Sequence, residues 1–214
     1  MHILEAIMPP LVFTLPKHPF DYQYLSHRLR HYRSPRAKIG LMMKNKEIIR
    51  IKKGLYILPE KYGVTLDKIL LSNLIYGPSY VSFEYALSYW GLIPEKVEEV
   101  TAVTNKRKKR FETPVGVFSY RFLNKRIFPV GRVLIKDDAG SSMIASKEKA
   151  LCDRLATIKE IKTEKDAVAY LETDLRIDWE EIKDLDVVQL KSIMAHYNSK
   201  PVTVFVSWYI GYYI

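Results

Sequence analysis

Cysteine is almost absent from this chain: of its 214 residues, only Cys152 is a cysteine. A single cysteine excludes an internal disulfide framework and is typical of a protein from a reducing cytoplasm. Cys152 stands among apolar residues of a predicted helix, so we expect a buried thiol in the core. No apolar run reaches the roughly 18 residues that a membrane-spanning helix needs. The first residues also lack the basic segment and cleavage site of a signal peptide. We therefore expect a cytoplasmic protein that does not cross a membrane.

The sequence motifs of common enzymes are also missing. None of the nine glycines forms a P-loop, a G-x-G-x-x-G fingerprint or a G-x-S-x-G turn. Among the five histidines, only His27 and His31 have a helical metal-ligand spacing, and no acidic or thiol ligand stands beside them. We therefore expect no cofactor and no bound metal.

Positive charge, by contrast, is abundant and unevenly distributed. The formal net charge is +10, and residues 1–136 carry 24 lysines and arginines against 10 acidic residues. Residues 137–214 carry 10 against 14. A basic front half predicts a polyanion such as nucleic acid as partner, and a generally basic, solvated surface is the alternative.

Residues 20–58 have the pattern of two short helices followed by a β-hairpin. Apolar residues recur at helical spacing over 20–32, and a second helix is predicted to begin with Ser34 as N-cap and Pro35 as its first residue. That helix ends near Asn45. An alternating segment follows, with its turn at Lys53-Gly54, because glycine accepts positive φ. This order of elements predicts a winged helix-turn-helix.

The remainder predicts an N-terminal arm and an α+β domain. Four prolines prevent a long helix in residues 1–19. The domain boundary is expected near Leu58-Pro59. Beyond it, helices are predicted over 65–76, 79–90, 146–158, 164–173, 178–184 and 187–197, and strands between 97 and 133. The aromatic tail after Lys200 is expected to be a core strand or helix, or a surface that meets a partner.

Two groups of basic residues are candidate nucleic-acid contacts. Lysine and arginine neutralise phosphates, and arginine can also read guanine, which makes Arg36 the candidate for base recognition. The first group, on the second helix and the predicted wing, is Arg33, Arg36, Lys38, Lys44, Arg50, Lys52 and Lys53. The second group, an exposed run between two strands, is Lys106, Arg107, Lys108, Lys109 and Arg110. A solvated surface remains the alternative for both.

A third cluster could indicate a metal-dependent nuclease. Glu148, Lys149 and Asp153 stand near the start of one predicted helix, with Asp137 and Asp138 upstream. However, adjacent residues of a helix point about 100° apart, whereas a metal needs convergent carboxylates. We therefore favour a helix N-terminus with an acidic first turn and a buried face. The clustered tyrosines, Tyr76 to Tyr89, are likewise expected to pack rather than to stack on bases.

Four stretches carry a resemblance to a known family. They are IIRIKKGLYILPE, GPSYVSFEYALSYWGLIPE, TAVTNKRKKRFETPVGVFSYRFL and SSMIASKEKALCD, in this order. The chain resembles the AbiEi-like antitoxins of type IV toxin–antitoxin and abortive phage infection systems, over most of residues 20–155. The compact 29–42 stretch departs from the family pattern and predicts that its second and third helices are fused or that one is shortened.

The resemblance implies a DNA-binding repressor and antitoxin that is not an enzyme. Its winged helix would bind inverted repeats in its own promoter. Its C-terminal domain would oppose a nucleotidyltransferase-type toxin, directly or indirectly. Two alternatives from other classes stay open: a metal-dependent nuclease that uses the acidic residues of the C-terminal domain, and a non-catalytic interaction module whose aromatic tail docks a partner.

Overall fold

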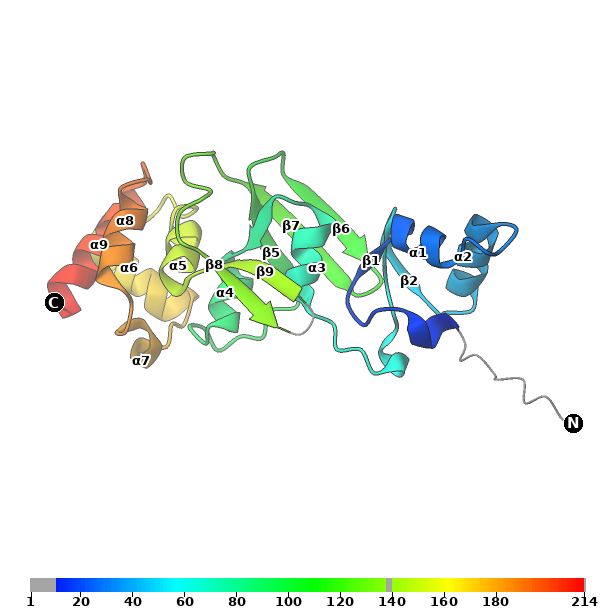
Figure 1. The fold of residues 1–214 in the computed structure, drawn as a ribbon. Coiled ribbons are helices and arrows are strands. Elements are labelled where there is room, and N and C mark those ends of the chain that lie inside the picture. Colours follow the sequence, from blue (N-terminus) through cyan, green and yellow to red (C-terminus); the bar gives the residue numbers. More distant parts are fainter. Residues whose placement is uncertain (1–10, 138–139, 214) are drawn as a thin grey trace, which may run out of the picture. The chain divides into compact units, whose positions relative to one another are not determined.

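The computed structural model describes residues 11–137 and 140–213 and has a mixed α+β fold, as predicted (Figure 1). Two compact units divide the chain. The first unit comprises Met1–Asp67 with Thr113–Val115, and the second comprises Lys68–Glu112 and Gly116–Ile214. The first unit thus continues past the predicted boundary near Leu58. No helix among the described residues has both the length and the apolar character that crossing a membrane requires.

The first unit combines short helices with a small antiparallel sheet. In chain order its elements are η1 (Leu11–Thr14), β1 (Phe20–Asp21), α1 (Tyr22–Arg28), α2 (Pro35–Lys44), β2 (Ile49–Lys52), β3 (Leu55–Ile57) and η2 (Glu60–Tyr62). The strand order is β1-β3-β2, and both pairings are antiparallel. The predicted pair of helices and the hairpin after them are therefore present.

A single apolar core holds the first unit together. Leu25 and Leu29 from α1 and its C-terminal cap meet Ile39 and Met42 of α2 there. Residues 11–19 of the predicted arm also contribute, since Val12 is buried in the same cluster. Residues 1–10, the rest of the arm, lie outside the described residues.

The two helices of the first unit begin at side-chain caps. Asp21 accepts a hydrogen bond from the backbone N–H of Tyr24 at 2.7 Å, which starts α1 two residues later than the predicted helix. The predicted start of α2 is confirmed, with Ser34 as N-cap and Pro35 as first residue. The two predicted helices are separate, because the chain leaves α1 after Arg28 and a new cap starts α2.

The second unit is built on a six-stranded mixed sheet with the order β6-β7-β5-β4-β9-β8. Strand β4 lies inside the sheet, antiparallel to β5 and parallel to β9, while β5 runs parallel to β7. The outer strand β8 pairs antiparallel with β9. The strands are β4 (Ser79–Val81), β5 (Val100–Thr104), β6 (Lys109–Thr113), β7 (Gly116–Phe122), β8 (Arg132–Asp137) and β9 (Gly140–Ala145).

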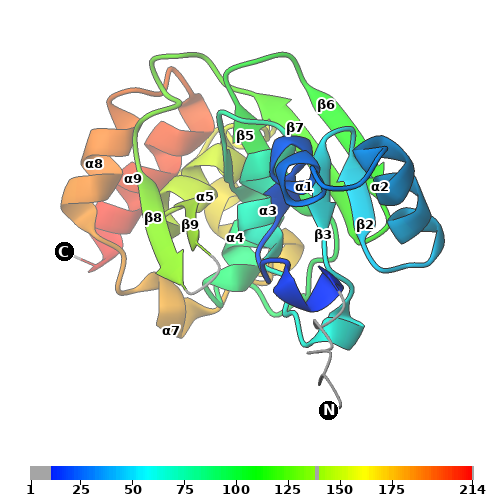
Figure 2. The ribbon, with the colours of Figure 1, turned by 45° about the vertical axis from the view of Figure 1, so that its right-hand side comes forward.

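Helices α3 (Lys68–Ile75) and α5 (Lys147–Leu155) cover opposite faces of this sheet. Tyr120 of β7 donates a hydrogen bond to the Ser72 carbonyl of α3 at 2.7 Å. Its side chain shares a face with Val81, because Tyr120 pairs with Ala102 and Ala102 with Val81. Tyr80 is the next residue to Val81 and points to the other face, where its hydroxyl reaches α5. Figure 2 shows the sheet between its helices.

The predicted helix over 79–90 was wrong in its first third. Residues 79–81 form β4, and α4 spans Phe83–Tyr89. A strand buried on both faces is as apolar as a buried helix, so hydrophobicity alone did not separate the two. The chain turns between them at Phe83, which has a positive φ of 55°. That conformation is uncommon for an aromatic residue and needs support from its surroundings.

Thr101 of β5 provides that support. Its hydroxyl donates to the Ser82 carbonyl at 2.7 Å and accepts from the Tyr85 N–H at 3.3 Å. Ser82 is the N-cap residue of α4, but its own hydroxyl is turned away from the helix and makes no cap hydrogen bond. A threonine from the neighbouring strand therefore does the capping.

The chain ends in a group of helices beside α5. They are α6 (Glu164–Ala169), the π-helix η3 (Tyr170–Asp174), α7 (Trp179–Ile182), α8 (Val187–Met194) and α9 (Lys200–Tyr213). The aromatic tail is thus a helix. One side of it, including Phe205 and Tyr209, is buried, whereas Tyr212 near its end is 70% exposed. Removing the chain after Lys200 would therefore remove part of the core.

Candidate nucleic-acid interface

Helix α2 turns one side to the core and the other to solvent. Ile39 and Met42 are buried, so residues half a turn away from them face outward. Lys44 is exposed on that outer side, and Arg36, three residues before Ile39, is exposed at its edge. The helix ends where the Asn45 N–H donates to the Leu41 carbonyl at 2.9 Å. The packing of α2 therefore presents its cations to solvent.

The β2–β3 hairpin presents further cations beyond α2. Gly54 occupies the turn with a φ of 85°, a conformation that glycine adopts without strain. Ile51 and Leu55 are buried, while Arg50 and Lys53 are exposed. The apolar side chains therefore fix which side of the hairpin packs and leave the basic side outward.

The seven residues predicted on α2 and the hairpin share one charge environment. Residues 33–58 contain eight lysines and arginines and a single acidic residue, Glu47. Its carboxylate accepts a hydrogen bond from Asn45. Arg33, Arg36, Lys44, Arg50 and Lys53 are exposed, and Lys38 and Lys52 are half-buried. The Lys38 ammonium lies 5.5 Å from the centre of the Tyr32 ring. In the described part of the chain, no ion pair engages Arg33, Arg36, Lys38, Lys44, Arg50 or Lys53.

The second predicted basic group lies in the second unit and is exposed throughout. Three of its residues, Lys106, Arg107 and Lys108, are in the loop, but Lys109 and Arg110 begin β6, so the run does not fall wholly between strands. Strand β6 is an edge of the sheet. Exposed lysines on an edge strand also discourage pairing with other chains.

Within this second group, the residues differ in how their charge is compensated. Arg110 pairs with Glu112 and lies 3.7 Å from the Glu99 carboxylate. The Lys106 ammonium donates to the Gly77 carbonyl at 2.6 Å, and Lys109 lies 5.0 Å from the centre of the Phe111 ring. No carboxylate among the described residues pairs with Lys106, Arg107, Lys108 or Lys109. Four positive charges of this group are therefore not compensated by a carboxylate.

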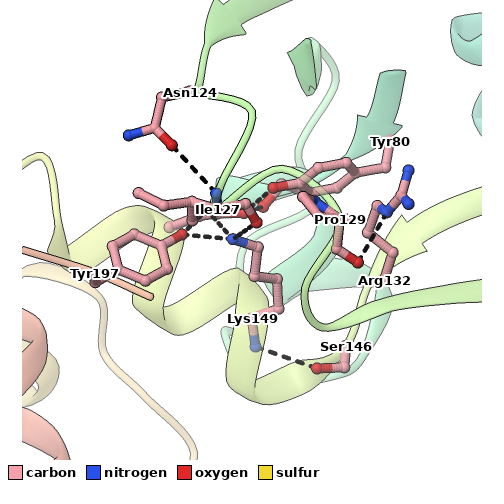
Figure 3. A network of polar contacts seen from close by, with 10 residues as sticks. Tyr80, Asn124, Ile127, Pro129, Arg132, Ser146, Lys149 and Tyr197 are labelled. Atoms are coloured by element: carbon pink, nitrogen blue, oxygen red, sulfur yellow. Dashed lines mark hydrogen bonds and ion pairs between the residues drawn. The ribbon is translucent and has the colours of Figure 1, made fainter. Parts of the chain in front are cut away.

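Two residues of the third predicted cluster, Lys149 and Asp153, belong to a buried polar network (Figure 3). Lys149 and Asp153, one turn apart on α5, are both inaccessible to solvent and lie 3.0 Å apart, Nζ to Oδ1. The Lys149 ammonium also donates to the Tyr197 hydroxyl at 2.6 Å and to the Ile127 carbonyl at 3.5 Å. All three of its protons thus have acceptors.

The Asp153 carboxylate is equally well satisfied. Besides Lys149, it accepts hydrogen bonds from three hydroxyls: Tyr197 on Oδ1, and Tyr80 at 3.0 Å and Ser82 at 2.7 Å on Oδ2. These donors come from β4, from its junction with α4, and from the segment between α8 and α9. The network therefore ties α5 to both the sheet and the C-terminal helices.

The loop that supplies the Ile127 carbonyl is itself held by side chains, as Figure 3 shows. Asn124 accepts a hydrogen bond from the Ile127 N–H at 3.2 Å, and Arg132 donates to the Pro129 carbonyl at 3.2 Å. At the loop's end, Gly131 has a φ of 70°, and a Cβ atom there would lie 2.8 Å from the Cβ of Lys149. Only glycine fits so close to the lysine.

Burial governs the proton affinities in the network. It lowers the pKa of Lys149, and the attraction of Asp153 opposes this effect only in part. Burial together with the neighbouring Asp153 carboxylate raises the pKa of Tyr80 and of Tyr197. The Cys152 thiol is fully buried, as predicted, and burial raises its pKa too.

This arrangement lends no support to a nuclease. The Glu148 carboxylate does not point into the network but accepts the Asp186 N–H at 2.9 Å. Asp137 and Asp138 provide no further argument, since their side chains lie outside the described residues. Across residues 11–137 and 140–213, no three histidine, cysteine or acidic side chains come together as metal ligands. Both α5 carboxylates have structural partners.

Sequence reasoning recognised the acidic first turn of α5 but missed that its charged residues are buried. The only local signal was the spacing of Lys149 and Asp153, which suits an intrahelical ion pair. The other partners, Tyr80, Ser82 and Tyr197, are 44 to 73 residues away from Asp153. No known protein family matches the chain, and no curated protein is significantly similar to it. The resemblance to AbiEi-like antitoxins therefore stays a prediction.

Proposed function

We propose that the first unit is a winged helix-turn-helix domain that binds double-stranded DNA. The observation that carries this proposal is the excess of positive charge on α2 and the β2–β3 hairpin. Residues 33–58 contain eight basic residues and one acidic residue. DNA binds such surfaces by exchanging counterions for protein cations. The order of a strand, two helices and a hairpin, with β1 completing the sheet, supports the same proposal.

In this proposal, α2 enters the major groove and the hairpin is the wing. Arg33, Arg36, Lys38 and Lys44 approach the bases and the phosphates beside them, with Arg36 the candidate to read guanine. Arg50, Lys52 and Lys53 contact the adjacent backbone. Lys106, Arg107, Lys108 and Lys109 form a second phosphate-binding surface, while Arg110 contributes less because Glu112 and Glu99 compensate its charge.

We further propose that the protein is a transcriptional repressor and the antitoxin of a type IV toxin–antitoxin system. It would act in the cytoplasm, occupy inverted repeats in its own promoter, and oppose a nucleotidyltransferase-type toxin through its second unit. The support is the resemblance of the four sequence stretches together with the basic first unit. No catalytic role is part of the proposal.

DNA binding is tested with the full-length chain and the duplex that precedes its own gene, by gel shift across a salt series. Replacing Lys52 and Lys53 together by glutamate should weaken binding. It should also reduce the slope of log K against log salt concentration by about 0.9 for each lost phosphate contact. Replacing Lys159 and Lys162 by glutamate makes the same charge change on exposed residues of the second unit and serves as control. Equal effects of the two double variants would remove the hairpin from the interface.

The antitoxin role is tested separately, by co-expression with a nucleotidyltransferase encoded beside the gene. Growth should stop with that partner alone and resume when this chain is also produced. Growth arrest that persists in the presence of the folded chain would contradict the antitoxin role and leave DNA binding untouched.

A further inference from the structure

The solvent side of α2 is not uniformly polar. Leu41 of this helix is 48% exposed. Ala37 is exposed as well, one helical turn before it, so the two side chains are neighbours on the helix surface. Gly40 stands beside them, and a Cβ atom built there would meet nothing within 4 Å. A narrow apolar strip therefore runs along the outside of α2.

Cations flank this strip at both ends. Lys44 follows Leu41 by three residues and lies on the same side of the helix, whereas Arg36 precedes Ala37 and points about 100° away from it, at the edge of the strip. Helix α2 contains no acidic residue. A protein groove that received this face would have to accommodate leucine and two unpaired cations together. A DNA major groove offers phosphates at its rims and base edges at its floor, which matches the pattern of charged flanks around an apolar centre.

The base edges that an apolar side chain can recognise are few. Leucine and alanine neither donate nor accept hydrogen bonds, so they gain little from the polar atoms of guanine, cytosine or adenine. Thymine alone among the four bases exposes a methyl group, at C5, in the major groove. Burying that methyl group against an aliphatic side chain is favourable and distinguishes thymine from every other base.

We propose that Leu41, beside Ala37, reads a thymine methyl group in the major groove and thereby makes thymine the preferred base at the position it contacts in the operator. This inference rests on the proposed DNA-binding function and adds its substrate preference. Lys44 positions the helix on the phosphates, and Gly40 leaves room for the strip to approach the bases. Leu41 is then a determinant of specificity that works without a hydrogen bond.

The experiment removes single methyl groups from the DNA. Duplexes are selected by the full-length wild-type protein from a library with 20 randomised base pairs. Each thymine of the enriched site is then replaced, one at a time, by deoxyuridine, which lacks only the methyl group. At one or two positions the affinity of the wild-type protein should fall roughly 3- to 5-fold, the effect expected for one buried methyl group. The Leu41→Ala variant should bind the thymine and uracil duplexes equally well.

The control is Leu74→Ala, which removes an equally exposed leucine, 43% accessible, from α3 of the second unit. This variant should keep the full preference for thymine. Because Leu41 is half exposed, its replacement should leave the circular dichroism spectrum and the melting temperature nearly unchanged. A wild-type protein indifferent to every uracil replacement, or a Leu41→Ala variant that still discriminates, overturns the inference while DNA binding stands. A library in which no sequence is enriched overturns sequence-specific DNA binding itself, and the inference with it.

Discussion

The buried pair on α5 leads to a specific ordering of stabilities. Lys149→Met removes the cation and keeps the shape of its aliphatic stem, whereas Asp153→Leu removes the shared acceptor of the network. Breaking one side of a buried ion pair typically costs about 3–5 kcal/mol, because the remaining charge is left without compensation. We expect both variants to be destabilised, but not equally.

The inequality follows from the hydrogen bonds around each charge. After Lys149→Met, the Asp153 carboxylate keeps three hydroxyl donors. The loss in unfolding free energy should therefore lie near the lower end of the range for a broken buried ion pair, about 3 kcal/mol. After Asp153→Leu, the buried ammonium keeps only two neutral acceptors, and three hydroxyls lose theirs at about 1 kcal/mol each. The total should exceed about 5 kcal/mol. The double variant buries no charge and should be less destabilised than Asp153→Leu alone.

The assay is equilibrium unfolding in urea followed by tryptophan fluorescence. All three tryptophans, Trp90, Trp179 and Trp208, belong to the second unit, so the signal reports the unit that contains the network. Lys147→Met is the matched control on the same helix. Its partly exposed ion pair with Glu181, at 2.6 Å, should contribute no more than about 1 kcal/mol.

Three outcomes would refute this reasoning. One is a Lys149→Met variant no less stable than the control. Another is a reversed order of the two single variants. The third is a double variant whose cost equals the sum of the single costs, which would mean that the two charges do not interact. If Asp153→Leu proves unfolded in buffer, Tyr197→Phe tests the same network at an expected cost of about 1–3 kcal/mol, because it removes one donor and one acceptor.

Two further predictions follow from burial and capping. Burial lowers the pKa of Lys149, so between its folded pKa and the usual lysine value the unfolded chain binds more protons, and the free energy of unfolding should rise with pH. Urea titrations at a series of pH values up to the usual lysine value of 10.5 should show a rise that Lys149→Met lacks, and parallel curves for the two proteins would contradict the prediction. Thr101→Val removes the hydroxyl that caps α4 while keeping the β-branched shape, and the same fluorescence assay should record a loss of about 1–3 kcal/mol; a loss below about 0.5 kcal/mol would mean that Phe83 needs no such support.

Local signals were sufficient at several places where a single residue controls the backbone. Ser34 with Pro35, Gly54, and Ser146 each mark an element boundary that the structure reproduces, because capping and positive φ act over a few residues. Alternation also identified the hairpin. The first unit was therefore largely predictable as a set of elements.

Features set by distant contacts were not predictable from local patterns. Strand β4 looks like the start of a helix, since Tyr80 and Val81 are apolar on both sides, and only pairing with β5 and β9 decides the matter. The burial of Lys149 depends likewise on Tyr197 and on the Ile127 carbonyl, which no spacing on α5 reveals. The candidate DNA contacts were predicted from the local excess of lysine and arginine, which the charge count alone shows.

The partners of Asp153 also set an order of events during synthesis of the chain. Tyr80 and Ser82 are made before Asp153, but Tyr197 comes 44 residues after it. At translation rates of about 5–20 residues per second, Tyr197 is synthesised roughly 2–9 s after Asp153. During this time Asp153 lacks one of its hydrogen-bond donors and Lys149 lacks one of its acceptors. Over that interval the burial of these two incompletely paired charges against the sheet is unfavourable. The second unit should therefore complete its folding only after Tyr197 has been synthesised. A nascent chain stalled before residue 197 should remain sensitive to proteases.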